Sequence, residues 1–408
     1  MTDATPTLDA YQRVFALSFL ANGVMSQVAP RDVLAQRLFH KLSYYLTVPS
    51  GAEPPDRKYR AFAAPDHRAF AALGQGEVVW GPAVNATGLT WLKDATNAAF
   101  VARFADFHSP PGGPTGPVYV VAIAATNPTS LRDILIQDGF VDQVVAWEGF
   151  KPADVVHGDP PVDPQTTPYI SRATAQGVSD LLLKLSPPDW APAGGRSLMD
   201  FLAGVQEEDA ALVFCGHSLA GALSPTLALY LAESSERPLA GFGERVWTYP
   251  TAGATPGNQA FADRFAMRFG PVSWDGAVET AGYRLFNARL WNHYDVVPHA
   301  WALTTHTDCD GEQSPSMAEI LGLYGELDLL TRLAVWADVH PAEHLSTESG
   351  IDYWTLNGVR LDEPRPATPK DYAGFWETLL KCHIYDYGHG LILADGLPGD
   401  YPDYQLEA

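Results

Sequence analysis

The chain has 408 residues, 46% of them hydrophobic, which is enough for a large buried core in one domain or two. Its 48 acidic and 26 basic residues give a net charge of −22, and this charge repels the phosphates of nucleic acids and anionic lipids. The composition therefore argues against nucleic-acid binding and indicates an acidic globular protein.

The sequence shows neither an uninterrupted membrane span nor a secretory signal. Polar residues interrupt the apolar stretch at residues 11–25, and the first residues lack the basic region of a signal peptide. Three alternatives remain: the sequence is that of a mature exported form, the protein stays inside the cell, or it is exported by another route. The cysteines Cys215, Cys309 and Cys382 allow at most one disulfide, for which the last two are the candidates. No Cys/His spacing predicts a zinc site.

The first predicted elements are helices. Apolar residues recur about every 3.6 positions across residues 8–48, which predicts two helices separated by Pro30. With a further short helix expected at 61–74, they make an N-terminal helical extension over residues 1–75. Strands are then expected at residues 77–80, 97–104 and 117–125. The last of these is rich in β-branched residues, as a central parallel strand is.

Helices and strands alternate in the rest of the chain, which indicates an α/β sheet. Further helices are expected at residues 131–137, 171–185, 198–205, 219–231, 259–269, 314–338 and 372–380. Further strands are expected at residues 143–147, 212–214, 245–249 and 283–290. Residues 151–168 are rich in Pro, Gly and Asp, and they fit either a lid over the site or a surface loop.

The stretch Ala211–Leu223 predicts a catalytic nucleophile. Its apolar run at 212–214 predicts a buried strand, and leucines at helical spacing follow Ser218, so the chain turns sharply at this serine. Such a turn strains the backbone of the serine and requires small residues two positions before and after it, as Gly216 and Ala220 are. The alternative is a structural serine that caps the helix.

A serine hydroxyl becomes a good nucleophile when an imidazole takes its proton and a carboxylate orients that imidazole. In the α/β-hydrolases, whose nucleophile turn this stretch resembles, the acid and then the histidine follow the serine along the chain. Asp295 is the predicted acid because it follows a strand and precedes a Val-Val-Pro run, and Asp310 and Asp338 are weaker rivals. His383, in the final stretch of the chain, is the predicted base, with His389 as the alternative.

Attack on a carbonyl group also needs hydrogen-bond donors for the developing oxyanion. The backbone N–H of Leu219, directly after the serine, is the first predicted donor. Thr126 is the second, because it follows the strand at 117–125. Four further residues are predicted to line the substrate pocket: His217, Tyr249, His293 and His299.

With these residues, the chain resembles the class 3 lipases, a branch of the α/β-hydrolases. The likeness rests on four blocks, at residues 216–223, 120–126, 248–265 and 292–298. They are similar to the family's Gly-His-Ser-Leu-Gly-Gly-Ala-Leu, its strand ending in Arg-Gly-Thr, its Phe-Gly-x-Pro-Arg-Val-Gly-Asn and its Asn-x-x-Asp-x-Val-Pro. Ala220 replaces a glycine of the first block, and Ala124 and Ala125 replace the Arg-Gly of the second.

The resemblance implies a single α/β-hydrolase domain over residues 1–408, with a mostly parallel central sheet flanked by helices. It assigns the acid role to Asp295 and an oxyanion role to Thr126. The interval between Asp295 and His383 is longer than in the family, so residues 305–370 fit an inserted cap.

The resemblance also implies a serine ester hydrolase that uses an acyl-serine intermediate and needs no metal or organic cofactor. Acylglycerols or related lipid esters are the expected substrates, with transient contact at a lipid interface. Phospholipase, feruloyl esterase, short-chain esterase, polyester hydrolase and acyltransferase activities are alternatives that use the same triad. A non-catalytic hydrolase-fold protein that binds a lipid or a partner is an alternative from another class. The oligomeric state is not predicted.

Overall fold

The structure is a computed structural model that describes residues 8–25, 27–47, 73–89, 92–124, 140–155 and 161–392. Most of the helix expected at 61–74, and all of the helix expected at 131–137, lie outside these residues. The oxyanion candidate Thr126 also lies outside them.

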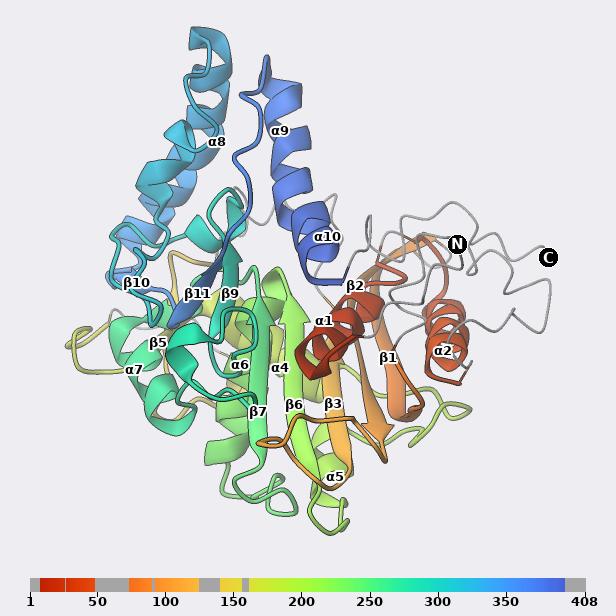
Figure 1. The fold of residues 1–408 in the computed structure, drawn as a ribbon. Coiled ribbons are helices and arrows are strands. Elements are labelled where there is room, and N and C mark those ends of the chain that lie inside the picture. Colours follow the sequence, from red (N-terminus) through yellow and green to blue (C-terminus); the bar gives the residue numbers. More distant parts are fainter. Residues whose placement is uncertain are drawn as a thin grey trace.

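The described strands form a seven-stranded central sheet in the order β1-β2-β3-β6-β7-β9-β11 (Figure 1). Its members are β1 (Glu77–Leu89), β2 (Leu92–Phe104), β3 (Val118–Ile123), β6 (Ala211–His217), β7 (Val246–Thr251), β9 (Arg289–Asn292) and β11 (Gly358–Leu361). The first three strands pair antiparallel, and every pairing from β3 to β11 is parallel. The predicted mostly parallel sheet is therefore confirmed.

A smaller antiparallel sheet, which the sequence analysis did not predict, lies beside the first. Its order is β10-β8-β5-β4, with β10 (Tyr353–Trp354), β8 (Gly257–Asn258), β5 (Tyr169–Ser171) and β4 (Val144–Ala146). The strand expected at 143–147 belongs to this sheet. Short strand pairings of this kind join segments that are far apart in the chain, so no local sequence pattern predicts them.

Helices cover both faces of the central sheet, which explains why its inner strands are apolar on both sides. Alternate residues of β3 and β6 belong to two separate hydrophobic clusters, one on each face. One face packs against α1 (Ala10–Ala21), α2 (Arg31–Thr47) and α10 (Asp386–Ile392). The other packs against α4 (Arg172–Leu183), α5 (Leu198–Ala203), α6 (Leu219–Glu233) and α7 (Gln259–Arg268).

The first helix lies in the core of the molecule. Asp9 caps α1 in a capping box with Gln12, which satisfies backbone N–H groups at the helix start. The helix is apolar on most of its faces, and nearly all its residues are buried under β3, β6 and β7. A helix that is apolar on all its faces is stable in water only when other elements cover all of those faces. Here the sheet and α10 cover them.

A pair of helices projects beyond the carboxyl ends of the parallel strands (Figure 1). The pair is α8 (Leu329–Glu348) and α9 (Tyr372–Leu380), and the 3₁₀ turn η8 (Met317–Gly322) packs against α8. The segment expected as a cap, 305–370, contains α8 but also β11 of the central sheet. Among the described residues, no helix is long and apolar enough to cross a membrane.

Two predicted elements have different bounds in the structure. The strand expected at 283–290 begins only at Arg289, because Phe286 bridges to Val272 instead and Asn287 has a φ of 61°. The helix expected at 314–338 is two elements, η8 and α8, with a break between them. Three further 3₁₀ turns are described, namely η5 (Pro152–Asp154), η6 (Val278–Thr280) and η7 (Val297–His299).

Candidate active site

Ser218 lies at the sharp turn between β6 and α6. Its backbone angles, φ 63° and ψ −129°, are strained for a residue with a side chain. The Ser218 N–H donates to the carbonyl of Thr251 at 3.0 Å, which ties the turn to the end of the neighbouring strand β7. The serine side chain does not cap α6, so its hydroxyl remains available for other partners. The predicted strand-to-helix turn is present.

Small residues around this turn are required by direct backbone contacts. A Cβ on Gly216 would lie 2.4 Å from the carbonyl oxygen of Ala220 and 2.7 Å from its Cβ. A Cβ on Gly221 would lie 2.3 Å from the carbonyl oxygen of Thr251. Ala220 fits because its methyl group faces a glycine, so the departure from the family pattern is accommodated locally.

Ser218, His383 and Asp295 are joined by hydrogen bonds. The Nε2 atom of His383 lies 2.8 Å from Oγ of Ser218, and its Nδ1 lies 2.9 Å from both carboxylate oxygens of Asp295. A carboxylate only accepts, so Nδ1 carries the proton and Nε2 accepts from the serine hydroxyl. All three side chains are buried. This arrangement can move a proton from the serine to an imidazole that a carboxylate orients.

Backbone and tyrosine contacts fix the loop that carries Asp295. Its Oδ1 also accepts from the N–H of Val297 at 3.0 Å. Asn292, at the end of β9, donates its backbone N–H to the Tyr387 hydroxyl at 2.7 Å and its side chain to the carbonyl of Cys382 at 3.1 Å. Burial raises the pKa of Tyr387, and the nearby Asp295 charge raises it further, so this hydroxyl stays protonated.

His383 lies in a π-helical turn, η9 (Lys381–Tyr385), between α9 and α10. Helical segments therefore run on both sides of the histidine, whereas the sequence analysis expected a helix only as far as residue 380. Such π-turns are often found at functional sites. The alternative base, His389, is exposed on α10, and the hydrogen bonds of Ser218 and Asp295 go to His383.

His217, predicted to line the pocket, is buried and bonded to the backbone of His383. Its Nε2 donates to the carbonyl of His383 at 2.8 Å, and its Nδ1 lies 2.9 Å from the Thr251 hydroxyl. Its ring contacts Phe19 of α1 and Tyr387 edge-on. Burial lowers the pKa of His217 well below 6.5, and the neighbouring His383 lowers it further, so His217 is neutral.

The other residues predicted for the pocket have structural contacts. The Tyr249 hydroxyl donates to the carbonyl of Tyr283 in the core, 2.8 Å away. His299 lies between the carbonyls of Ser316 and His293, at 2.9 and 3.0 Å, and so braces the loop after Asp295. Buried side chains with partners of this kind hold the scaffold, and a place for Tyr249 and His299 in the substrate pocket stays a prediction.

His293, the fourth of these residues, is half-buried among the rings of Trp291, Tyr294 and His299. Burial lowers its pKa.

The two rival acids have partners away from the histidine. Asp310 accepts the backbone N–H of Arg360 at 2.6 Å, and Asp338 accepts from the hydroxyl of Tyr372. All three cysteines are free, so the candidate disulfide between Cys309 and Cys382 is not formed. Cys309 instead donates to the carbonyl of Gly358, and Cys382 is buried in η9.

The two oxyanion candidates differ in what the structure describes. Leu219 is the first residue of α6, where a backbone N–H has no carbonyl partner within its own helix. It is therefore available to a negatively charged oxygen next to Ser218, and the positive end of the helix dipole favours such a charge. Thr126 lies outside the described residues.

Sequence reasoning missed the residues that hold Ser218, His383 and Asp295 in place. Thr251 accepts the N–H of Ser218 and contacts His217, and Tyr387 supports the Asp295 loop. The sequence offered little indication of these roles, because Thr251 lies at the end of a strand and Tyr387 lies in the helix α10. Neither position has a motif that separates it from ordinary core residues.

A mostly parallel sheet with a strained serine at the end of a central strand, hydrogen-bonded to a histidine that in turn bonds to an acid, both from later in the chain, defines an α/β-hydrolase. Comparisons with known proteins agree with this class. Residues 196–305 match the family described as lipase (class 3). The segment that contains Ser218 and Asp295 thus matches the class 3 lipase family, in agreement with the resemblance stated from the motifs. This match also supports the predicted enzyme class, carboxylic ester hydrolase.

One solved structure among those compared shares the fold. The M37 lipase is similar over 95% of this chain and 94% of its own, with 22% identity and a TM-score of 0.66. A lipase from Rhizopus microsporus var. chinensis has 16% identity and a TM-score of 0.36, over 72% of this chain and 70% of its own. Lip2 lipase from Yarrowia lipolytica has 13% identity and a TM-score of 0.34, over 82% and 98%. Among curated proteins, no match was found.

Proposed function

We propose that the chain hydrolyses acylglycerols or related lipid esters through an acyl-serine intermediate, with Ser218, His383 and Asp295 as its triad. One observation carries the proposal: the chain of short contacts from Ser218 Oγ to Nε2 of His383, at 2.8 Å, and from Nδ1 to Asp295, at 2.9 Å. The family match supports the ester as the bond that is cleaved.

In the first half of the reaction, Ser218 Oγ attacks the ester carbonyl carbon while His383 takes the hydroxyl proton. Asp295 holds the imidazole in the reactive tautomer and stabilises the imidazolium that forms. The N–H of Leu219 donates to the oxyanion, and the sequence assigns the second donation to Thr126. The C–O bond of the ester then breaks, and the proton on His383 passes to the departing alkoxide, which leaves as the alcohol.

In the second half, a water molecule gives a proton to His383 and attacks the acyl-serine. The ester bond to Ser218 breaks, the serine regains its proton, and the free acid leaves. Transfer to an added alcohol would follow the same path with the alcohol in place of water. Hydrolysis is the proposed reaction because water is the acceptor present at highest concentration.

The test compares ester hydrolysis by the wild-type chain with Ser218→Ala, Asp295→Asn, His383→Ala and His389→Ala. We expect the first three substitutions to lower kcat by roughly four orders of magnitude or more. His389→Ala is the matched control and should stay within about twofold of wild type, since His389 is exposed on α10. Loss of activity in His389→Ala with full activity in His383→Ala would overturn the assigned base.

The substrate class is tested separately on the wild-type chain. Triacylglycerols of increasing chain length, phosphatidylcholine and a feruloyl ester are supplied in parallel, and release of acid is measured. Preference for triacylglycerols supports the proposal, and preference for either of the other esters overturns its substrate. A fluorophosphonate probe should label Ser218 in the wild-type chain, and failure to label would favour the non-catalytic alternative.

A further inference from the structure

Arg289, the first residue of β9, is a buried cation without a direct ionic partner. Its side chain is 2% exposed, and neither Nη1 nor Nη2 has a hydrogen-bond partner among the described residues. Its Nε donates to the carbonyl of Leu356 at 3.5 Å. The carboxylate of Asp308 is also buried, but its Oδ2 lies 3.9 Å from Nη2, which is too far for a hydrogen bond. Burial of a charge is costly unless direct contacts compensate for it, so this arrangement needs an explanation.

Trp291 adds a further unpaired donor at the same place. Arg289 and Trp291 are two residues apart on β9 and share one face of the strand, and the guanidinium carbon lies 5.7 Å from the centre of the Trp291 ring. Within the described part of the chain, Nε1 of Trp291 and Oδ2 of Asp308 also lack hydrogen-bond partners. A Cβ on Gly358 of β11 would lie 2.9 Å from Cδ1 of Trp291 and 3.2 Å from Oδ2 of Asp308, so these side chains converge. Buried polar atoms of this kind are usually bridged by ordered water.

The other oxygen of Asp308 is engaged by the edge strand of the sheet. Oδ1 accepts a backbone N–H of β11 at 3.2 Å and lies 3.4 Å from Nε2 of His306. These contacts hold the carboxylate at β11 and not in direct contact with the guanidinium. The charge of Arg289 is therefore only partly neutralised. Lys381 differs in this respect, because its Nζ lies 2.6 Å from a carboxylate oxygen of Asp386.

Arg289 lies near the proposed catalytic acid, because the loop that follows β9 carries Asp295. Burial lowers the pKa of Arg289, and the nearby Asp308, Tyr387, Asp295 and Asp310 oppose this effect. A guanidinium stays charged in proteins even when it is buried. Electrostatic interaction is mutual, so the cation at Arg289 favours the charged form of Asp295.

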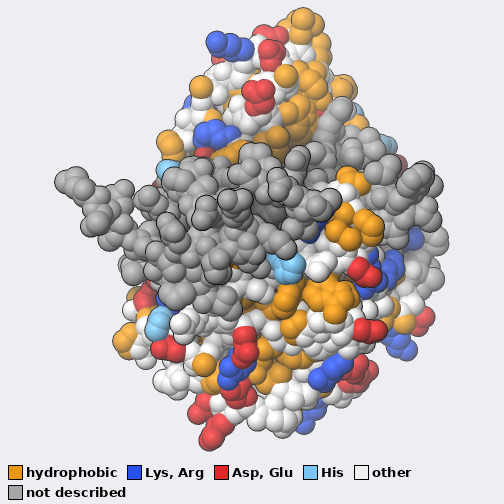
Figure 2. Space-filling view, turned by 90° about the vertical axis from the view of Figure 1, so that its right-hand side faces the viewer, with side chains coloured by type: hydrophobic (Ala, Val, Ile, Leu, Met, Phe, Trp, Pro, Cys, Tyr) orange, Lys and Arg blue, Asp and Glu red, His pale blue; other side chains and the backbone are white. Residues whose placement is uncertain are grey.

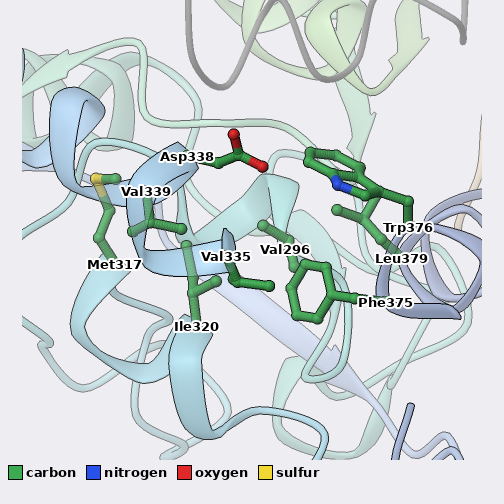
Figure 3. Close-up of a pocket in the computed structure, with 9 residues that line it drawn as sticks. All are labelled: Val296, Met317, Ile320, Val335, Asp338, Val339, Phe375, Trp376 and Leu379. Carbon is green, nitrogen blue, oxygen red and sulfur yellow. The ribbon is translucent and has the colours of Figure 1, made fainter. Parts of the chain in front are cut away.

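Other charges around the Asp295 loop are absent from its apolar side or screened by water. Val296, next to Asp295, packs against apolar side chains of α8 and α9 such as Phe375 (Figure 3). The carboxylate that lines the same space, Asp338, accepts from the hydroxyl of Tyr372. On the face shown in Figure 2, Lys and Arg side chains lie among Asp and Glu side chains, where water and salt screen both signs. A buried cation therefore acts on Asp295 more strongly than charges at the surface do.

We propose that Arg289 is a positioning residue of the site: its buried guanidinium, held apart from Asp308, stabilises the carboxylate of Asp295 in its charged form. This inference rests on the proposed function, because a charged Asp295 is what holds the imidazole of His383 in the reactive tautomer. Asp308 opposes the effect in part, so the two buried groups act on the imidazole with opposite signs. Arginine suits the role because it keeps its charge where a buried lysine can lose its own.

The test follows the titration of the His383 imidazole by NMR of the full chain with ¹⁵N-labelled histidines, and His383→Ala assigns its resonance. Arg289→Met removes a positive charge and so favours the imidazolium, and we expect the titration midpoint to move to higher pH by roughly half a unit or more. Asp308→Asn removes a negative charge and should move the midpoint to lower pH. Opposite movements indicate an electrostatic effect, because a disturbance of packing does not follow the sign of the charge removed.

Three control variants separate charge from packing. Arg289→Lys keeps the charge and should leave the midpoint within about 0.2 pH unit of wild type. Arg360→Met removes the same charge from β11, but Arg360 is partly exposed and lies 2.6 Å from Glu312, so its midpoint should also stay within about 0.2 unit. His306→Gln removes the other titrating group beside Asp308, and the movement caused by Arg289→Met should persist in this background.

Other titratable groups near Asp295 do not disturb the measurement. Burial raises the pKa values of Tyr387, Cys382 and Tyr324, so all three stay neutral between pH 5 and pH 9. Burial lowers the pKa of His217, which is therefore neutral over most of this range.

Two results would overturn the inference: midpoints that move in the same direction in Arg289→Met and Asp308→Asn, or midpoints that stay within about 0.2 pH unit of wild type in both. Circular dichroism checks folding. If one single variant does not fold, the other still gives a movement of predicted sign, and the double variant, with both charges removed, should have a midpoint between those of the two singles. The acid limb of kcat/KM on a soluble ester should move as the NMR midpoint does. Absence of ester hydrolysis in the wild-type chain would count against the proposed function, whereas the NMR titration reports on Arg289 without turnover.

Discussion

The Nε2 atom of His217 lies 2.8 Å from the backbone carbonyl oxygen of His383, so the residue before the proposed nucleophile holds the backbone of the proposed base. The hydroxyl of Thr251 contacts the other ring nitrogen at 2.9 Å. Three strand or helix ends thus meet at one buried imidazole. Any motion of η9 that displaced His383 would break this hydrogen bond.

Replacing His217 tests this relationship. His217→Phe keeps a ring against Phe19 and Tyr387 but removes both hydrogen bonds, which leaves the carbonyl of His383 without this donor. We expect the free energy of unfolding to fall by about 1–3 kcal/mol at pH 8 and kcat to fall at least tenfold. Urea unfolding and steady-state kinetics on a soluble ester measure the two effects. Unchanged kcat would show that His217 does not position the base.

The same variant makes a pH-dependent prediction. Burial lowers the pKa of His217 well below 6.5 in the folded chain, whereas the unfolded chain takes up this proton near pH 6.5. The stability that neutral His217 contributes is therefore complete above pH 6.5 and is lost as the pH falls toward the lowered pKa. The stability difference between wild type and His217→Phe should narrow between pH 7.5 and pH 5. A difference that stays constant over this range would contradict the prediction.

Adding even a methyl group at the glycines around Ser218 should destabilise the fold. Gly216→Ala and Gly221→Ala would press a Cβ against backbone oxygens at 2.4 and 2.3 Å, so we expect each to lower the free energy of unfolding by about 1–3 kcal/mol or more. Gly322→Ala is the matched control, because its Cβ would meet no atom within 4 Å. Ala220→Gly should be active. Equal stability of Gly221→Ala and Gly322→Ala in urea would refute the packing argument.

An ion pair at the other end of the sheet predicts a loss of stability in acid. Glu207 accepts from Arg103 and from the hydroxyl of Tyr119, and the Arg103 hydrogen bond lowers the pKa of Glu207 to about 2. Its contribution to stability is present above its usual pKa of about 4.5 and is lost as the pH falls toward 2. Glu207→Gln should therefore be less stable than wild type at pH 7, and the difference should shrink below pH 4.5.

Glu208→Gln is the control for this prediction, because Glu208 is the exposed neighbour of Glu207. Its stability should stay within about 0.5 kcal/mol of wild type at pH 7. Thermal unfolding from pH 7 to pH 3 measures all three chains. A Glu207→Gln chain as stable as Glu208→Gln at pH 7 would show that the pair contributes nothing measurable.

The cysteines should remain thiols even without reductant. Cys215 and Cys382 are buried, burial raises their pKa values, and burial raises the pKa of Cys309 to about 11. We expect slow labelling by a thiol reagent at pH 8 in the native chain, since the reagent attacks thiolates. In guanidinium chloride all 3 cysteines should react. Only one reactive thiol there would indicate a disulfide.

Local sequence was enough to predict the turn at Ser218 and much of the sheet. The apolar run before the serine, the leucines after it and the small residues on either side all act within a few positions of the chain. Asp295 could also be proposed from its own surroundings, because an acid after a strand lies at the carboxyl edge of a parallel sheet. These inferences depend on local backbone geometry, which is the same whatever tertiary fold the chain adopts.

Tertiary structure alone determined which histidine contacts Ser218. His383 and His389 are six residues apart, and six residues turn an α-helix by about 600°, so the two side chains point in different directions. From the sequence, the two histidines could be ranked only by their position in the chain. The packing of α9 against Val296, the π-turn and the His217 hydrogen bond together aim His383 at the serine.

The same holds for α1 and β11, which the sequence placed in an extension and a cap and which the structure places in the core and the central sheet. Residue patterns show that a segment is apolar and what period it has. They do not show which distant surface will cover it, because that depends on contacts between segments tens to hundreds of residues apart. The position of Ser218 at a sharp turn could thus be predicted from the residues next to it in the sequence. Which residues contact Ser218 depends on tertiary packing.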